Sequence, residues 1–258
     1  MRKTILILFC FFILTSTASA DVDFNAVDEI LSCGSGASLD DMDISSGMTI
    51  SLWINLDSLG EATDNGAFIS KGSEGDSGFW LLSATDTGTL RFDFTKDCAT
   101  TDLRRVSADN SISLSAYRHV LMTWDGTVDT TGVLFYVDGT QTSYGTSTTG
   151  VGAINSDAAL SVAIGNQIDL TNASDGRLSE VAVWDVILNA TEIAQLSKSR
   201  VKNMPLQVRP ASLMGYWPLQ ECASGSTCSS TFIDYSGNGN TCTPSNSPTG
   251  LGGIITQP

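Results

Sequence analysis

The sequence has few basic residues, and after its first fifteen residues it has no long apolar run. It contains 13 Lys and Arg against 28 Asp and Glu, which gives a formal net charge of −15. Contacts to nucleic-acid phosphates need clustered Lys and Arg. The composition therefore excludes a general nucleic-acid binder. The acidic excess also keeps a protein soluble and attracts cations, including Ca²⁺.

The usual residues of nucleophilic or zinc chemistry are also scarce. His119 is the only histidine, and the chain contains neither a C-x-x-C nor a G-x-S-x-G motif. A zinc cluster is therefore disfavoured, and a serine triad would need His119 as its base. His119 is opposite in phase to Val120 and Met122 in an alternating segment, which predicts a surface or rim position for it. We expect no enzymatic activity.

The N-terminus predicts export. Arg2 and Lys3 precede an apolar run of about ten residues, and Ala18-Ser19-Ala20 fits a small-x-small cleavage site. A membrane-spanning helix needs about 20 apolar residues. Residues 1–20 are therefore predicted to be a removed signal peptide, and the protein to be secreted or held at the extracellular surface, without an integral membrane segment.

Cysteine usage agrees with an oxidising compartment. Five of the six cysteines lie after the predicted signal peptide, and an odd count leaves at least one thiol free or paired with another chain. The sequence leaves the connectivity open. The disulfide candidates are Cys33, Cys98, Cys222, Cys228 and Cys242.

Apolar residues recur with a period of two along most of the chain. Met48–Leu56 and Val133–Val137 alternate clearly, and turn dipeptides such as Asp138-Gly139 separate the segments. One short helix is expected near residues 190–198, where Asn189 and Glu192 form a capping box. Further strands are predicted at 79–83, 89–94, 103–106, 117–124, 159–164, 177–184 and 212–219.

This pattern predicts an all-β fold, a two-sheet antiparallel jelly-roll sandwich. We expect one domain over residues 21–220. Residues 221–258 are rich in Cys, Gly and Ser and form a C-terminal tail, which is expected to wrap the domain or to be partly disordered.

Several segments, in this order, resemble laminin-G-like and pentraxin-like domains of the concanavalin A-like lectin/glucanase superfamily. They include an opening Asp23–Glu29, a strand with Ser51-Leu52-Trp53-Ile54, Arg118–Gly126, Leu134–Gly139, Ile164–Asn166, Asp175–Trp184, and Leu213–Leu219 followed by Asp234–Asn240. The resemblance implies two curved antiparallel sheets, with Phe24–Leu31 beside Leu213–Leu219. It also implies binding of Ca²⁺ and of sugars, proteoglycans or other proteins.

Two calcium sites are implied by the same resemblance. The pentraxin-like site would use Asp64 and Asn65 together with Gln167 and Asp169, all of them oxygen ligands that suit a hard cation. Gln167 stands where the family has a glutamate, which lowers the negative charge of the site. The second site would be structural and would lie near Asp28 and Glu180.

Glycoside hydrolases also occur among proteins with this resemblance. Their carboxylates lie on one strand as Glu-x-Asp-x-x-Glu, and this chain has no such run. Trp80 follows a glycine-rich loop and is predicted to be an exposed platform on which a sugar ring could stack.

The sequence therefore predicts a secreted, non-catalytic binding module for Ca²⁺-assisted recognition of carbohydrate or glycoconjugate. Its predicted partner is a glycan or surface glycoconjugate. The alternative is a self-assembling structural subunit of an extracellular filament, coat or sheath, whose partner would be copies of itself.

Overall fold

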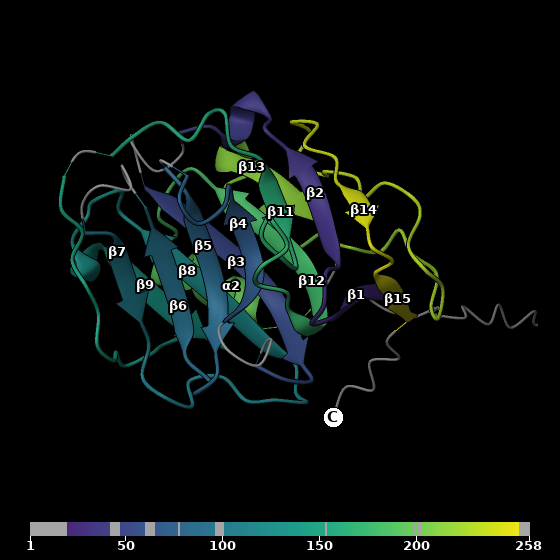
Figure 1. Cartoon of the computed structure of the whole chain (residues 1–258), viewed down its shortest axis with the longest axis horizontal. Coiled ribbons are helices and arrows are strands. Elements are labelled where there is room, and N and C mark those ends of the chain that lie inside the picture. Colours follow the sequence, from purple (N-terminus) through teal and green to yellow (C-terminus); the bar gives the residue numbers. More distant parts are fainter. Residues whose placement is uncertain are drawn as a thin grey trace, which may run out of the picture.

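The computed structural model describes residues 20–41, 47–59, 65–76, 78–95, 101–152, 154–198, 200 and 203–252. Two antiparallel β-sheets pack face to face in these residues (Figure 1), so the predicted jelly-roll sandwich is confirmed. The predicted signal peptide lies outside the described residues, except for Ala20.

The first sheet has eight strands. Seven follow the order β10-β9-β8-β3-β12-β1-β15, and β13 also pairs with β12. The strands are β1 (Ala20–Asn25), β3 (Met48–Leu56), β8 (Arg118–Trp124), β9 (Val133–Val137), β10 (Thr140–Gln141), β12 (Asp175–Trp184), β13 (Leu213–Trp217) and β15 (Thr249–Gly252).

The second sheet has seven strands in the order β14-β2-β11-β4-β5-β6-β7. These are β2 (Ile30–Gly34), β4 (Asn65–Lys71), β5 (Trp80–Thr85), β6 (Leu90–Phe94), β7 (Leu103–Val106), β11 (Val162–Ile164) and β14 (Thr243–Ser245). This sheet faces the viewer in Figure 1.

The core lies between the two sheets. Alternate residues of each strand contribute to it, as expected for a sandwich. Leu52 on β3, Phe92 on β6 and Trp124 on β8 are fully buried there, and the rings of Phe92 and Trp124 lie 5.3 Å apart between centroids. Residues on the opposite side of each strand therefore face away from the core.

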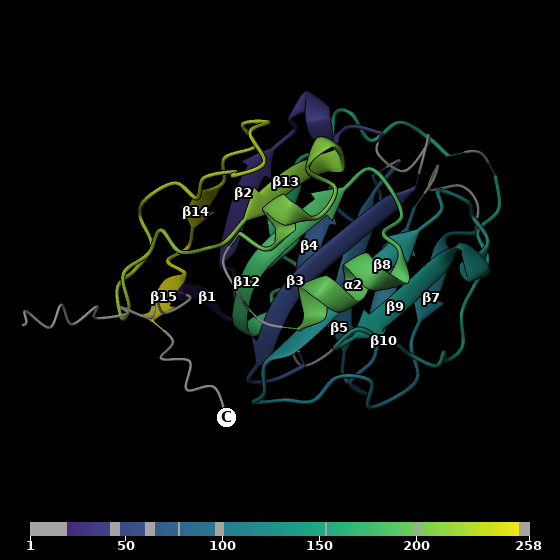
Figure 2. The same cartoon turned by 180° about the vertical axis from the view of Figure 1, so that it is seen from behind.

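Helix α2 (Ala190–Ser197) covers the outer face of the eight-stranded sheet, as Figure 2 shows. The predicted capping box is present, because Asn189 accepts from the backbone of Glu192 and Glu192 accepts from that of Asn189. Ile193 and Leu196 pack on Trp184 in a second apolar cluster. Among the described residues, no helix is long and apolar enough to cross a membrane.

The C-terminal segment adds a strand to each sheet. β14 pairs with β2, and β15 pairs with β1. Two disulfides fasten this segment, Cys33–Cys242 and Cys222–Cys228. Cys98, the remaining candidate, lies outside the described residues.

The expected pairing of Phe24–Leu31 with Leu213–Leu219 is wrong. The chain leaves β1 at Asn25 and crosses to the other sheet, where β2 begins at Ile30. β1 pairs with the first part of β12, and β13 pairs with the last part. The two strands therefore follow one another along the same edge of β12.

Candidate binding groove

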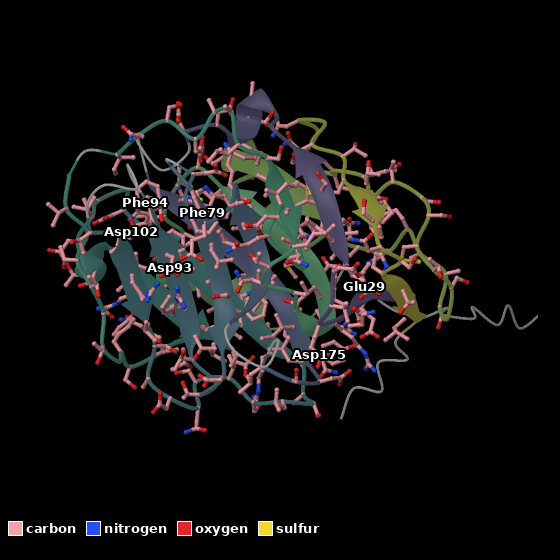
Figure 3. The ribbon with its side chains drawn as sticks, in the orientation of Figure 1. Glu29, Phe79, Asp93, Phe94, Asp102 and Asp175 are labelled. Atoms are coloured by element: carbon pink, nitrogen blue, oxygen red, sulfur yellow. A yellow bond between two sulfur atoms is a disulfide. The ribbon has the colours of Figure 1, made fainter. Side chains whose placement is uncertain are left out.

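A groove of about 680 Å³ lies on the face of the seven-stranded sheet that is turned away from the core. Figure 3 shows three of its lining residues, Phe79, Asp93 and Asp102, over β5, β6 and β7. The volume falls within the range of about 300–1,000 Å³ that is typical of small-molecule sites. It is larger than a neighbouring hollow of about 400 Å³ and a buried cavity of about 10 Å³.

Two arginines and one aspartate form the charged centre of the groove. Asp93 on β6 is ion-paired with Arg91 on its own strand and with Nε of Arg104 on β7, the latter at 2.8 Å. The Arg104 side chain is 48% exposed, whereas that of Asp93 is 9% exposed. Asp93 thus holds both guanidinium groups in place, and Arg104 keeps part of its donor surface open to the groove.

The groove has an apolar floor beside this charged centre. Phe79 and Leu81 line it and form a small cluster with Ala67, separate from the main core. Each is only 2% exposed. The groove therefore combines a small apolar floor with polar and charged walls.

The prediction of Trp80 as an exposed platform is wrong. Trp80 is 1% exposed and packs in the main core, with its indole nitrogen donating to Asp157 at 3.1 Å. Successive residues of a strand point to opposite faces. The groove therefore receives the two neighbours of Trp80, Phe79 and Leu81, and not Trp80 itself.

A second hollow of about 400 Å³ continues the groove along β6 and β7. It shares Arg91 and Arg104 with the first, and the hydroxyl side chains of Thr85, Thr87 and Ser107 contribute to its wall. The two arginines therefore line both hollows. Together the hollows form an elongated surface that is rich in hydrogen-bonding groups.

The loop at residues 166–172 forms one wall of the groove. Oδ1 of Asn166 accepts from the backbone N–H groups of Gln167 and Asn172, which fixes the loop at both ends. The hydroxyl of Thr171 contacts Oε1 of Gln167 at 3.1 Å and Oδ1 of Asp169 at 2.8 Å. Two of the predicted calcium ligands, Gln167 and Asp169, are thus brought together at the groove.

The calcium ligand set is incomplete in the described part of the chain. Asp64 lies outside it, and Asn65 begins β4, where its backbone pairs with Thr85. Gln167 and Asp169 supply the oxygen chemistry that Ca²⁺ prefers, but a full shell takes 6–8 oxygen ligands. No group of three or more His, Cys, Asp or Glu among the described residues is arranged to hold a metal ion. Calcium binding therefore stays a prediction.

The residues of the second predicted calcium site are in different surroundings. Glu180 is buried, and its carboxylate accepts from the hydroxyl of Tyr216 at 2.5 Å and from the amide of Gln220 at 3.2 Å. Asp28 lies in the turn after β1, and its carbonyl accepts from Asn246. The hydrogen bonds of Glu180 give this carboxylate a structural role, and its role as a metal ligand stays a prediction.

The prediction of a surface or rim position for His119 is wrong. Its side chain does point away from the main core, but α2 and the segment after it cover that face, and His119 is only 1% exposed. Its Nε2 lies 2.8 Å from the hydroxyl of Ser51, and burial lowers its pKa to about 4. The cavity beside Ser51 and His119 has a volume of only about 10 Å³, room for about one water and not for a substrate.

Sequence reasoning missed the groove's charged centre. Arg91 and Asp93 alternate with Leu90, Phe92 and Phe94, so the pattern does show that both face away from the core. The pattern could not show that Arg104, on the next strand, faces Asp93. In the structure Arg104 is the direct register partner of Asp93 between β6 and β7.

A carboxylate cluster lies at the other side of the molecule, where Figure 3 labels Glu29 and Asp175. Burial raises the pKa of Glu29 to about 7, and the charges of Asp23 and Asp28 add to this shift, while the N–H of Asn25 opposes it. Glu29 is 4% exposed and accepts from that N–H at 2.6 Å. Its ionisation therefore disfavours the folded state.

We expect Glu29→Gln to stabilise the protein at about pH 8 by on the order of 2 kcal/mol. Between the unfolded pKa of 4.5 and the folded value of about 7, the folded wild type binds more protons than the unfolded chain. Its stability therefore falls as the pH rises through this window. Urea denaturation at about pH 4, 6 and 8 measures the effect. The lowest pH is the internal control, since Glu29 is then mostly neutral in both states, and a pH-independent difference would contradict the assignment.

The fold and the groove define a class of protein, an antiparallel jelly-roll sandwich with a ligand-sized groove on one sheet. Residues 32–194, more than half of the chain, match the concanavalin A-like lectin/glucanases superfamily. The chain belongs to this superfamily. A comparison with curated proteins gave no match.

Two solved structures are similar to this chain. A putative carbohydrate-binding protein from Bacteroides ovatus aligns with a TM-score of 0.57 and 19% identity, over 93% of this chain and 61% of that one. A SAP-like pentraxin from Limulus polyphemus aligns with a TM-score of 0.48 and 16% identity, over 71% and 84% of the two chains. This chain thus spans about 61% of the Bacteroides protein, and at these identities the likeness extends to the fold alone.

Proposed function

We propose that this protein is a non-catalytic carbohydrate-binding module, and that the groove over β5, β6 and β7 is its binding site. The observation that carries the proposal is the ligand-sized groove of about 680 Å³ with Arg91, Asp93 and Arg104 at its centre. The superfamily membership supports a lectin-like role.

The chemistry of the groove suits a polyhydroxylated ligand. Guanidinium groups donate in a fixed planar arrangement and carboxylates accept, so together they can satisfy neighbouring hydroxyls of a sugar ring. Phe79 and Leu81 close the floor of the groove, and because each is only 2% exposed, most of the contact with a sugar would come from the polar walls. The second hollow lengthens the surface, so a chain of several sugar units is a better fit than a single unit.

The ion pairs of the groove argue for binding without hydrolysis. Glycoside hydrolysis needs two carboxylates about 5–10 Å apart, one of which attacks or activates water while the other protonates the leaving group. Both carboxylate oxygens of Asp93 are engaged by arginines, which leaves this side chain less free to attack a sugar. We expect incubation with any glycan that the protein binds to leave the chain length of that glycan unchanged.

The test is a matched pair of arginine substitutions. The mature protein is screened against immobilised neutral and acidic polysaccharides, and the best binder is titrated by calorimetry with wild type, Arg104→Ala and Arg118→Ala. Arg118 is the control, because it lies on β8 of the eight-stranded sheet, away from the groove, is 40% exposed and is ion-paired at 2.8 Å to Asp138. We expect Arg104→Ala to weaken binding at least about tenfold, the loss of one to two hydrogen bonds to a charged donor.

Equal affinities of the two variants would contradict the groove as the site, and no binding to any polysaccharide would contradict carbohydrate recognition.

Calcium assistance and secretion belong to the proposal as predictions from the sequence. The same titrations in Ca²⁺ and in a chelator test the first. Self-assembly, the alternative function, would appear as open-ended particles on a sizing column.

A further inference from the structure

A lysine is completely buried at the end of β4, in contact with two carboxylates. The side chain of Lys71 is 0% exposed, and its Nζ lies 2.7 Å from Oδ1 of Asp157, which is 1% exposed. A second carboxylate, Asp40, lies 3.1 Å from the same nitrogen and is 22% exposed. The backbone carbonyl of Leu39 accepts from Nζ at 2.6 Å.

Asp157 is held from several sides. Its Oδ2 accepts from the indole N–H of Trp80 at 3.1 Å, and its Oδ1 accepts from the backbone N–H of Asp41 at 2.8 Å. Its own backbone N–H donates to Oδ1 of Asp41 at 3.0 Å. The carboxyl group of Asp157 is therefore fixed against the lysine nitrogen in a site without access for bulk water.

A buried ion pair of this kind is a costly way to join two segments. The desolvation of each charge costs several kcal/mol, and the attraction between the charges often fails to offset it. Condensation of the amine and the carboxyl group would remove both charges. The three groups that such a reaction needs are present, namely a nucleophile, an electrophile with a donor on its carbonyl oxygen, and a neighbouring carboxylate that can carry protons.

We propose that Lys71 and Asp157 form an intramolecular isopeptide bond. The uncharged amine attacks Cγ of the protonated Asp157 side chain, and the N–C bond forms while negative charge gathers on Oδ2, which Trp80 stabilises. Asp40 takes a proton from the nitrogen and returns it to Oδ1, which leaves as water. Starting from the ammonium and the carboxylate, the products are one amide and one water, and nothing is oxidised or reduced.

The geometry supplies the driving force. Groups held in reactive contact behave as if present at effective concentrations of about 10⁵–10⁸ M, and burial keeps bulk water from the amide. Asp40 is the partly exposed member of the cluster and lies on the side from which the released water can escape. The bond would join β4 to the loop before β11 across 86 residues of sequence.

Mass spectrometry of the purified mature protein tests the proposal. After reduction of the disulfides, we expect an intact mass lower than the sequence mass by one water, and a branched peptide that joins Lys71 to Asp157 in the digest. Asp-Gly steps such as Asp125-Gly126 and Asp175-Gly176 can also lose water as cyclic imides. The loss must therefore disappear in Lys71→Met, which leaves these steps intact.

Three further variants keep the test independent of folding. Asp157→Asn would react with loss of ammonia and give the same amide, so its mass should equal that of the reacted wild type. Asp40→Asn should leave most of the protein at its full mass, whereas Asp76→Asn, a nearby carboxylate that instead accepts from Ser73, should react like the wild type. A folded wild type at its full sequence mass, without the branched peptide, would overturn the proposal.

Discussion

Replacement of Cys33 and Cys242 by serine should lower the free energy of unfolding by about 5 kcal/mol, the loop-closure entropy that the chain-entropy model assigns to a disulfide of this span. The two residues are separated by 209 positions in the sequence. For a domain of this size, the midpoint of thermal unfolding should fall by on the order of 10 °C or more. Differential scanning calorimetry or urea denaturation of the double variant measures the loss.

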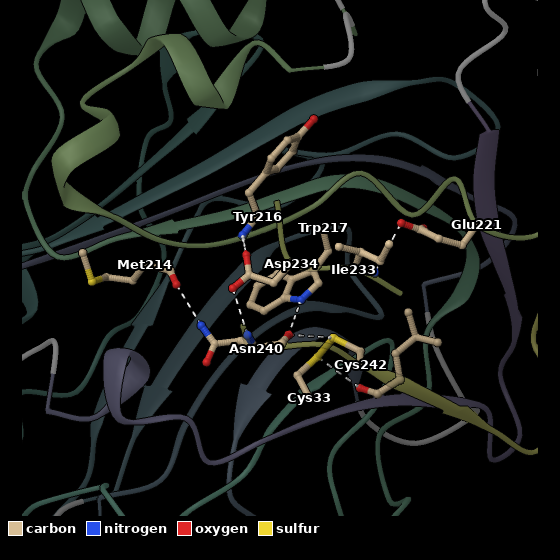
Figure 4. The surroundings of a disulfide bond; sticks show 10 residues. Cys33, Met214, Tyr216, Trp217, Glu221, Ile233, Asp234, Asn240 and Cys242 are labelled. Carbon is tan, nitrogen blue, oxygen red and sulfur yellow. Dashed lines mark hydrogen bonds between the residues drawn. A yellow bond between two sulfur atoms is a disulfide. The ribbon is translucent and has the colours of Figure 1, made fainter. Parts of the chain in front are cut away.

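The position of this disulfide explains why the loss should be large. It connects β2 with the residue before β14, the two neighbouring strands at one edge of the seven-stranded sheet. Cys242 is fully buried and Cys33 is 5% exposed, and Figure 4 shows both beneath Trp217 and Asn240. Without the bond, β14 would be held to the edge of the sheet by a pairing of three residues and by the contact of Asn246 with Asp28.

The second disulfide is the matched control. Cys222–Cys228 spans only six positions, for which the same model gives about 2 kcal/mol. The Cys222→Ser/Cys228→Ser protein should therefore lose less than half as much stability as the Cys33→Ser/Cys242→Ser protein. Equal losses would show that the constraint on the unfolded chain is not the cause.

Strands with clean alternation could be predicted from the sequence almost to the residue. The predicted bounds of β3 and β9 agree with the structure, and so do those of β7, although Leu103–Val106 does not alternate. β4 was missed because Ala67, Phe68 and Ile69 are all fully buried, so the period of two disappears. A register shift between Ala67 and Ile69 in the pairing with β5 accompanies this run.

The candidate site could be predicted only in part. Gln167 and Asp169 line the groove. They could be predicted because the family resemblance locates the loop that carries them. The alternation places Trp80 on one face of β5 but does not say which face is covered. His119 shows the same limit, since its phase on β8 was right while the covering helix comes from a distant part of the chain. Burial on the outer face of a sheet depends on tertiary contacts that a local pattern does not contain.

The second large loss of stability is expected from a substitution in the C-terminal segment. We expect Asp234→Ala to lower the free energy of unfolding by about 4 kcal/mol, since hydrogen bonds to a charged acceptor contribute about 1.5–3 kcal/mol each and are not additive. Asp234 is 6% exposed. Its Oδ1 accepts from the N–H groups of Tyr216 at 3.0 Å and Ser236 at 2.9 Å, and its Oδ2 accepts from that of Asn240 at 3.0 Å.

These bonds connect the loop at residues 234–240 to β13. The carbonyl of Asn240 accepts from the indole N–H of Trp217 at 2.6 Å, and its amide donates to the carbonyl of Met214 at 2.9 Å, as Figure 4 shows. The alanine variant would leave the N–H of Tyr216 buried without its acceptor, and would release the loop that leads to Cys242. The substitution should therefore weaken all the contacts between the loop at residues 234–240 and β13.

Urea denaturation of Asp234→Ala, Asp234→Asn and Asp86→Ala measures this effect. Asp86 is the control, an exposed aspartate in the turn between β5 and β6, whose loss should change stability by less than about 0.5 kcal/mol. The stability of Asp234→Asn should lie between those of Asp234→Ala and Asp86→Ala, because its amide keeps one acceptor oxygen but points a donor at an N–H group. A loss below about 1 kcal/mol in Asp234→Ala would mean that the bonds of Asn240 and the Cys33–Cys242 disulfide hold the loop without Asp234.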